Sequence, residues 1–64
     1  MTNYRKETQR RLRQLLKVEI AVFKSFPRKD SFSALYIAEK INDIQGEMKS
    51  RNMKWKPFVA NLHN

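Results

Sequence analysis

Apolar residues recur along the first part of the chain with the spacing of a helix that is buried on one side. At about 100° per residue, this apolar face consists of Leu12, Leu15, Leu16, Val22, Phe23 and Phe26. Basic and polar residues occupy the opposite side, so one helix carries both core residues and positive charge. The pattern predicts a helix over about residues 4–25, with Thr2 or Asn3 as its N-terminal cap.

Pro27 predicts the end of this helix, because the residue before a proline avoids the helical region and the ring cannot continue the hydrogen-bond ladder. Residues 26–30 are then a turn, and Asp30 or Ser31 is suited to cap a second helix over about residues 31–50. Such a short connection favours antiparallel neighbours. We therefore expect an all-α fold, an antiparallel two-helix hairpin, in a single small helical domain.

The second helix carries an apolar stripe that matches the first in length. Its members are Ala34, Ile37, Ala38, Ile41, Ile44 and Met48. Gly46 weakens the case for an unbroken helix by about 1 kcal/mol relative to alanine, and Asn52 is suited to end it. Residues 51–64 are expected to form a C-terminal extension, with a short helix over residues 58–62 after Pro57.

A chain of 64 residues has a core that supplies only about 3–5 kcal/mol unless something else braces it. No cysteine is present, which excludes disulfides and thiolate metal sites and suits the cytoplasm or another reducing intracellular compartment. The single histidine, His63, has no second histidine with which to hold a metal. We expect no metal and no other cofactor, and we expect a homo-oligomer or a larger protein partner to complete the fold.

The longest uninterrupted apolar run, residues 20–23, is far shorter than the roughly 20 residues of a membrane span. No signal peptide is expected, because no small-residue cleavage site follows the charged N-terminal residues. A single glycine excludes a glycine-rich phosphate loop, and no nucleophile stands beside a base. We therefore expect a non-enzymatic protein with no transmembrane segment and no small-molecule substrate.

The positive charge is concentrated in the first part of the chain. Fourteen Lys and Arg residues against six Asp and Glu give a net charge of +8, and nine of the cations but only three of the anions fall within residues 1–30. Such a surface attracts phosphate. The residues expected to contact DNA or RNA are Arg5, Lys6, Arg10, Arg11, Arg13 and Lys17, with Arg28 and Lys29 as reinforcement.

Trp55 stands between Lys54 and Lys56 in the C-terminal extension. Two roles are open for it. Its ring could cap the core of the hairpin, or it could stack on a nucleobase while the two lysines meet phosphate.

Glu19 falls at the centre of the first helix's apolar face, where an unpaired carboxylate would be costly. One explanation is a pair with a basic residue of the second helix, or a position left open to water at the edge of the core. The other is that Glu19 sets the register of a dimer or meets a basic residue of another protein.

Phe32, Leu35 and Tyr36 point away from the apolar stripe of the second helix. Either the C-terminal extension folds over them, or they form an exposed patch that marks a protein interface. In the second case Trp55 would join the patch.

Taken together, the sequence predicts a small basic regulatory or accessory protein that binds nucleic acid through its first helix. One alternative is an inhibitor or adaptor that docks a larger protein through the aromatic patch. A second alternative is an RNA-embedded subunit of a large ribonucleoprotein.

Overall fold

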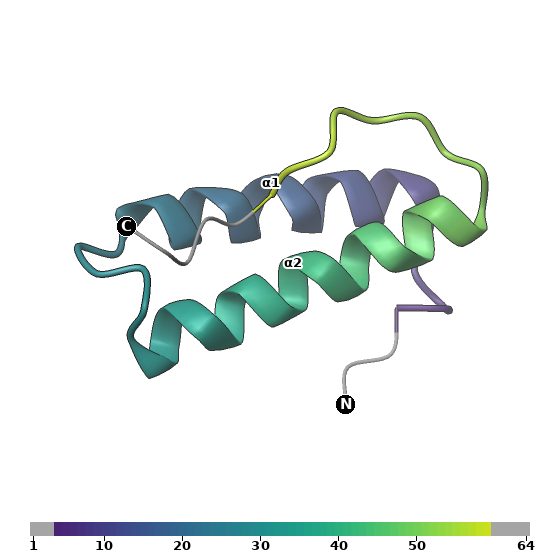
Figure 1. Ribbon diagram of the computed structural model, residues 1–64. Helices are drawn as coiled ribbons and strands as arrows, with labels where there is room; N and C mark the ends of the chain where they lie inside the picture. The colour runs from purple at the N-terminus through teal and green to yellow at the C-terminus, as the bar shows by residue number, and fades with distance from the viewer. Residues whose placement is uncertain (1–3, 60–64) are drawn as a thin grey trace.

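The computed structural model describes residues 4–59 and contains, within that range, two α-helices and no strand (Figure 1). Helix α1 spans Gln9–Ser25 and helix α2 spans Phe32–Ser50. They lie side by side in opposite directions, and the chain after α2 turns back over α1 (Figure 1). The predicted all-helical hairpin is confirmed.

Helix α1 begins later than the hydrophobic pattern predicted, at Gln9 rather than near Tyr4. Thr8 is its N-cap: its backbone is extended, and its hydroxyl accepts a hydrogen bond of 3.0 Å from the Arg11 N–H. The preceding residues instead form a turn, in which the Glu7 N–H donates to the Tyr4 carbonyl at 3.1 Å. The predicted caps, Thr2 and Asn3, lie outside the described residues.

Long-range contacts explain this later start. The Tyr4 side chain is buried in the core, with 8% of its surface exposed. The Arg51 guanidinium, from the end of α2, donates to the carbonyls of Tyr4 at 3.2 Å and Arg5 at 2.7 Å. In a continuous α-helix these carbonyls would be used by N–H groups four residues farther along, so the contacts with Arg51 favour a turn.

Helix α2 follows the prediction closely. Ser31 is its N-cap and accepts a hydrogen bond of 3.2 Å from the Ala34 N–H. The helix continues through Gly46, where an added Cβ would meet no atom within 4 Å. Asn52 adopts a left-handed conformation with φ 57°, which lets the N–H of Met53 donate to the Met48 carbonyl at 3.0 Å. The predicted stop at Asn52 is therefore present.

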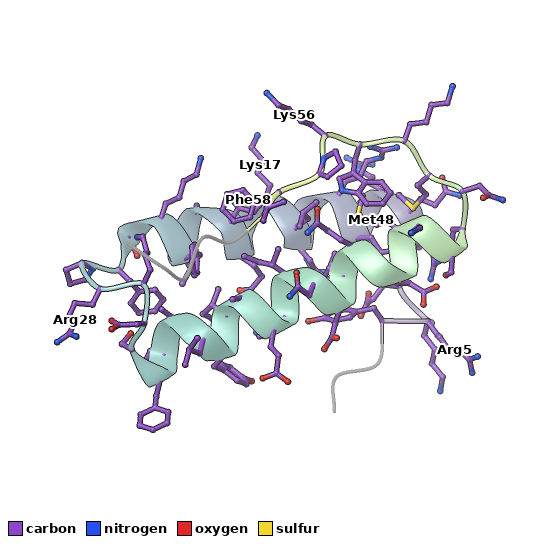
Figure 2. All side chains as sticks on the ribbon, viewed as in Figure 1. Arg5, Lys17, Arg28, Met48, Lys56 and Phe58 are labelled. Atoms are coloured by element: carbon purple, nitrogen blue, oxygen red, sulfur yellow. The ribbon has the colours of Figure 1, made fainter. Side chains whose placement is uncertain are left out.

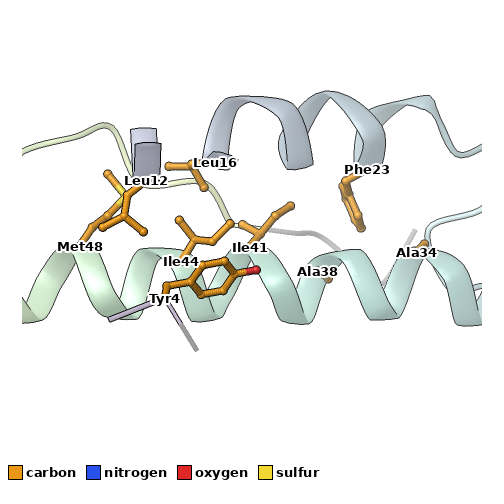
Figure 3. Close-up of a cluster of buried hydrophobic side chains, with 9 residues drawn as sticks. All are labelled: Tyr4, Leu12, Leu16, Phe23, Ala34, Ala38, Ile41, Ile44 and Met48. Atoms are coloured by element: carbon orange, nitrogen blue, oxygen red, sulfur yellow. The ribbon is translucent and has the colours of Figure 1, made fainter. Parts of the chain in front are cut away.

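The core lies between the facing sides of the two helices (Figure 3). Its buried apolar residues are Tyr4, Leu12, Leu16, Phe23, Ala34, Ala38, Ile41, Ile44 and Met48. Figure 3 shows Phe23 facing the stretch of α2 that carries Ala34 and Ala38. Small side chains there leave room for the ring, as large and small residues alternate in well-packed cores.

The chain beyond α2 is an irregular tail, which we define as residues 53–59. Met53, Trp55 and Phe58 are half-buried and pack against the core. Residues 58 and 59, the first two of the predicted short helix over residues 58–62, are not helical. The remaining residues of that prediction lie outside the described range. Over residues 53–59 the chain is an extension without helix or strand.

Glu19 lies within the core, with 8% of its surface exposed, and pairs with Lys40 of α2. Lys40 Nζ is 3.0 Å from Glu19 Oε2. Apart from this ion pair, the buried oxygen has no hydrogen-bond partner among the described residues. The intramolecular pair that the sequence left open is thus present. The pKa of Lys40 is raised above its usual 10.5, chiefly by this direct contact with the carboxylate, although burial acts in the opposite direction.

We predict that Lys40→Met alone destabilises the fold by about 1–3 kcal/mol, because it leaves a buried carboxylate without its counter-charge. The cost is below that of a fully buried pair, since the Lys40 side chain keeps 28% of its surface exposed. The double variant Glu19→Leu/Lys40→Met should recover most of the loss, because both partners become apolar together. Urea unfolding followed by circular dichroism measures the free energy of unfolding of the wild type, the single variant and the double variant. An equal loss of this free energy in the single and double variants would contradict the role of the pair.

Alkaline pH gives a second readout of the same pair. Because the folded-state pKa of Lys40 lies above its unfolded value, the stabilisation is complete below about pH 10.5 and is lost as the pH rises through the raised pKa. The wild-type melting temperature should therefore fall more steeply above pH 10.5 than that of the double variant.

Candidate nucleic-acid interface

Four cations form a stripe along one side of α1. Arg10, Arg13, Lys17 and Lys24 fall within about 60° of one another around the helix axis, and all four are exposed. Within residues 4–59, none of them forms an ion pair with a carboxylate. We call this set the basic stripe. No carboxylate of the described residues therefore neutralises its charge.

The tail is held beside the basic stripe by one side chain, that of Gln45 on α2. Its Oε1 accepts hydrogen bonds from the Phe58 N–H at 2.8 Å and from the Trp55 indole N–H at 2.9 Å. Its Nε2 donates to the Phe58 carbonyl at 2.8 Å. The amide of Gln45 therefore matches both backbone groups of Phe58 and also orients the Trp55 ring.

Phe58 continues this attachment toward the second half of α1. Its ring meets Phe23 edge-on, with centroids 6.0 Å apart and planes at 76°. The Lys24 ammonium lies 5.7 Å from the centre of the Phe58 ring. The tail thus packs on the side of α1 that carries the basic stripe.

Between the tail and the helices is a hollow of about 250 Å³, which we call the basic hollow. It is lined by Arg13, Leu16, Lys17, Ile20, Met48, Trp55 and Lys56. Figure 2 shows Lys17 and Lys56 extending on the same side of the molecule, one from α1 and one from the tail. The hollow therefore combines three cations with an apolar floor and an indole ring.

No carboxylate is among the described residues that line the basic hollow. Three of the acidic residues are used elsewhere: Glu19 pairs with Lys40, Asp30 with Arg28, and Glu47 with Arg51. Three cations around one hollow repel one another, so a bound anion would relieve the repulsion. The arrangement is suited to a phosphate attached to an apolar or aromatic body.

Five of the predicted contact residues lie elsewhere. Lys6 is exposed in the turn before α1, where the Arg5 carbonyl accepts from Arg51. Arg11 projects from another side of α1, and its guanidinium donates to the Gln14 side chain at 3.3 Å. The structure therefore brings Arg10, Arg13 and Lys17 together, but it does not gather the whole predicted set on one surface.

The two basic residues of the turn have structural partners. Lys29 Nζ donates to the carbonyls of Phe23 at 2.9 Å, Lys24 at 3.0 Å and Phe26 at 2.6 Å, which satisfies the C-terminal end of α1. Arg28 makes two bonds of 3.2 Å to Asp30, and this guanidinium lowers the pKa of Asp30. Arg28 remains exposed, whereas the Lys29 ammonium is occupied.

Trp55 takes the first of the two roles that the sequence left open, because it packs against the core, and stacking on a nucleobase stays a prediction. It is half-buried against the core and also lines the basic hollow. Lys56 lines the hollow with it, whereas Lys54 is exposed on the tail and is not part of the lining.

Phe32, Leu35 and Tyr36 form an exposed patch on the outer side of α2, with 92%, 38% and 59% of their surfaces exposed. The described part of the tail lies on the other flank of α2, at Gln45, and leaves them open. Trp55 is held there by Gln45 and does not join the patch. Glu39 and Asp43, both exposed, follow on the same side of α2, so the outer side of this helix is acidic as well as aromatic.

Sequence reasoning missed two parts of this site. Lys24 was outside the predicted set, although its helical spacing from Arg10 and Lys17 could have revealed it. The meeting of Arg13 and Lys17 with Lys56 had no sequence signal, because nothing local specifies which way the tail turns after Asn52.

No known protein family, no curated protein and no solved structure matches this chain. Neither helix in the described range has the length and apolar character needed to cross a membrane. Residues 4–59 contain no cluster of three or more His, Cys, Asp or Glu side chains that could hold a metal ion. What the site can do must follow from its own geometry and charge.

We predict that Gln45→Ala releases the tail. Three hydrogen bonds worth about 0.5–1.5 kcal/mol each are lost, so the attachment of the tail should weaken by about 1.5–4.5 kcal/mol while α1 and α2 remain helical. Trp55 is the only tryptophan, so a red shift of its fluorescence emission reports its exposure. Asn42→Ala is the matched control, since this exposed amide on the same helix makes no side-chain hydrogen bond within residues 4–59. Unchanged emission in Gln45→Ala would show that the amide does not hold the tail.

Proposed function

We propose that this protein is a small non-enzymatic regulatory or accessory protein that binds nucleic acid through the basic stripe of α1 and the neighbouring tail. The observation that supports this best is the convergence of cations from α1 and the tail around the basic hollow, with no carboxylate among its described lining residues. A polyanion is the partner that such a surface attracts.

Binding would be mainly electrostatic. From Arg10 to Lys24 the basic stripe extends about 21 Å along the helix axis, the distance over which one strand of a duplex presents roughly six phosphates. Neutralising them releases condensed counterions, which drives binding without reading sequence. DNA and RNA both offer this backbone, and an RNA-embedded subunit of a ribonucleoprotein would use the same surface.

We predict that binding to DNA or RNA weakens steeply with salt. If about five phosphates are neutralised, log K should fall against log salt with a slope of roughly −3.5 to −4.5. Arg10→Glu, in the basic stripe, should weaken binding about tenfold and make the slope shallower by about 1. Fluorescence anisotropy with labelled oligonucleotides across a salt series measures both quantities.

Lys49→Glu is the matched control, because it changes the net charge equally but lies on α2, outside the basic stripe. It should leave affinity nearly unchanged. Equal effects of the two reversals would mean that charge acts without a located interface, and no binding of either polymer at low salt would refute the proposal.

The exposed patch on α2 favours a second candidate function, docking to a larger protein or to another copy of the chain. The Phe32 ring is 92% exposed and shares its side of α2 with Glu39 and Asp43. An aromatic residue beside two carboxylates matches a partner surface that is basic around an apolar recess. An inhibitor or adaptor would act through this side and leave the basic stripe free.

We predict that Phe32→Ser abolishes any such association while stability changes by less than about 0.5 kcal/mol, because a ring this exposed contributes little to the core. Sedimentation equilibrium tests self-association, and a nuclease-treated pull-down tests a heterologous partner. Val59→Ser is the control, because Val59 is 83% exposed on the tail, away from the patch. A monomer that retains no protein after nuclease treatment would rule out this second function.

A further inference from the structure

We infer that the basic hollow takes one unstacked nucleobase together with its adjacent phosphates, so that the protein binds single-stranded nucleic acid in preference to duplex. This inference rests on the proposed nucleic-acid function and assigns a ligand form to one part of its surface. The observation behind this inference is the apolar and aromatic lining of the hollow, because a site that binds only phosphate would not need such a lining.

The lining divides into two chemical parts. Leu16 and Ile20 form an apolar floor over the fully buried Met48, and Trp55 adds an aromatic surface. Arg13, Lys17 and Lys56 bring positive charge to the same space. A nucleotide in a single strand has the matching division, because its base is a planar apolar ring and its phosphates are anionic.

Trp55 is preorganised for stacking. Its indole N–H donates to Gln45 Oε1 at 2.9 Å, and the same oxygen accepts from the Phe58 N–H at 2.8 Å. These bonds fix the ring before any ligand arrives, so little side-chain entropy is lost on binding. Stacking on an aromatic side chain contributes about 1–3 kcal/mol per base.

The basic hollow is small. Sites for drug-sized ligands and cofactors have volumes of about 300–1,000 Å³, whereas the basic hollow has about 250 Å³. It suits one planar ring rather than a dinucleotide. A base within a duplex is stacked and paired, so a duplex would contact only the surrounding cations.

A second hollow, of about 550 Å³, is also bordered by Trp55 but has different chemistry. It is lined by Asn42, Gln45, Gly46, Lys49, Trp55, Pro57, Phe58 and Val59. Lys49 is its single cation among these residues. Phosphate would therefore favour the basic hollow, where three cations converge.

The test compares Trp55→Phe with Trp55→Leu. Both variants lose the indole N–H and its bond to Gln45, so any loosening of the tail is common to both, but only the phenylalanine retains a stacking ring. Anisotropy with labelled oligothymidine and with a duplex of equal length gives the affinities at fixed salt. The leucine variant should bind the single strand roughly 5- to 100-fold more weakly than the phenylalanine variant, while both bind the duplex equally.

In the wild-type protein, oligothymidine should quench Trp55 fluorescence more strongly than the duplex does when each is at saturation. This measurement needs no substitution, so it tests base binding in the hollow even if a Trp55 variant unfolds. Vesicles of anionic phospholipid are the third ligand, and quenching by them as strong as that by oligothymidine would overturn the inference in favour of a lipid headgroup.

Two failures are distinguishable. No binding of either polymer by the wild type at low salt would refute the proposed function itself. Equal affinity for single strand and duplex, with the leucine and phenylalanine variants alike, would refute the base-binding role of the hollow and leave charge-driven binding intact.

Discussion

Two helices share only one interface, and here the open side of that interface is closed by a tail that the amide of Gln45 holds in place. That amide satisfies both backbone groups of Phe58 and the indole N–H of Trp55, so three polar groups beside the core are paired by one side chain. The Phe58 ring then reaches Phe23, and Trp55 covers the flank of the core. The position of the tail, the closure of the core and the shape of the basic hollow all follow from this contact.

The exposed surface of α1 is mainly basic and the outer side of α2 is acidic, but the buried pair between Glu19 and Lys40 has the opposite arrangement of charges. The basic helix α1 contributes the carboxylate of Glu19, and α2, which is acidic on its outer side, contributes the ammonium of Lys40. A charge at this depth is tolerated only opposite its partner, so the pair opposes sliding of one helix along the other. The exposed cations of α1 lie on the side where the tail packs, whereas the exposed patch of α2 lies on the outer side of that helix, which the described part of the tail leaves open. A partner at Phe32 would not compete with a polyanion at the basic stripe.

Local signals were sufficient to predict most of the hairpin from the sequence. Helical periodicity gave both apolar faces, Pro27 and Ser31 gave the turn, and Asn52 gave the end of α2, because each acts on its immediate neighbours. The start of α1 was mispredicted because Tyr4 enters the core and Arg51 binds nearby carbonyls, and both contacts join distant parts of the chain. The same reason applies to the site: Arg13 and Lys17 were predicted as contact residues and Lys56 was considered for phosphate, but their meeting depends on the tail. The abundance of cations was only a partial guide to the site, since the Lys29 ammonium is used within the fold, by three carbonyl groups and the Phe23 ring.

The tail has two roles in this structure, and they cannot vary independently. Trp55 covers the core and also lines the basic hollow, while Lys56 lines that hollow together with Arg13 and Lys17. Any ligand held there would contact α1 and the tail together, and it would therefore bind the folded arrangement and not the unfolded chain. By linkage, such a ligand raises the free energy of unfolding of this small-cored fold by RT ln(1 + L/Kd), where L is the free ligand concentration, so the gain grows with that concentration. Stabilisation by a partner, which the short chain led us to expect, would then come from the molecule that the basic surface attracts, without any need for a second protein.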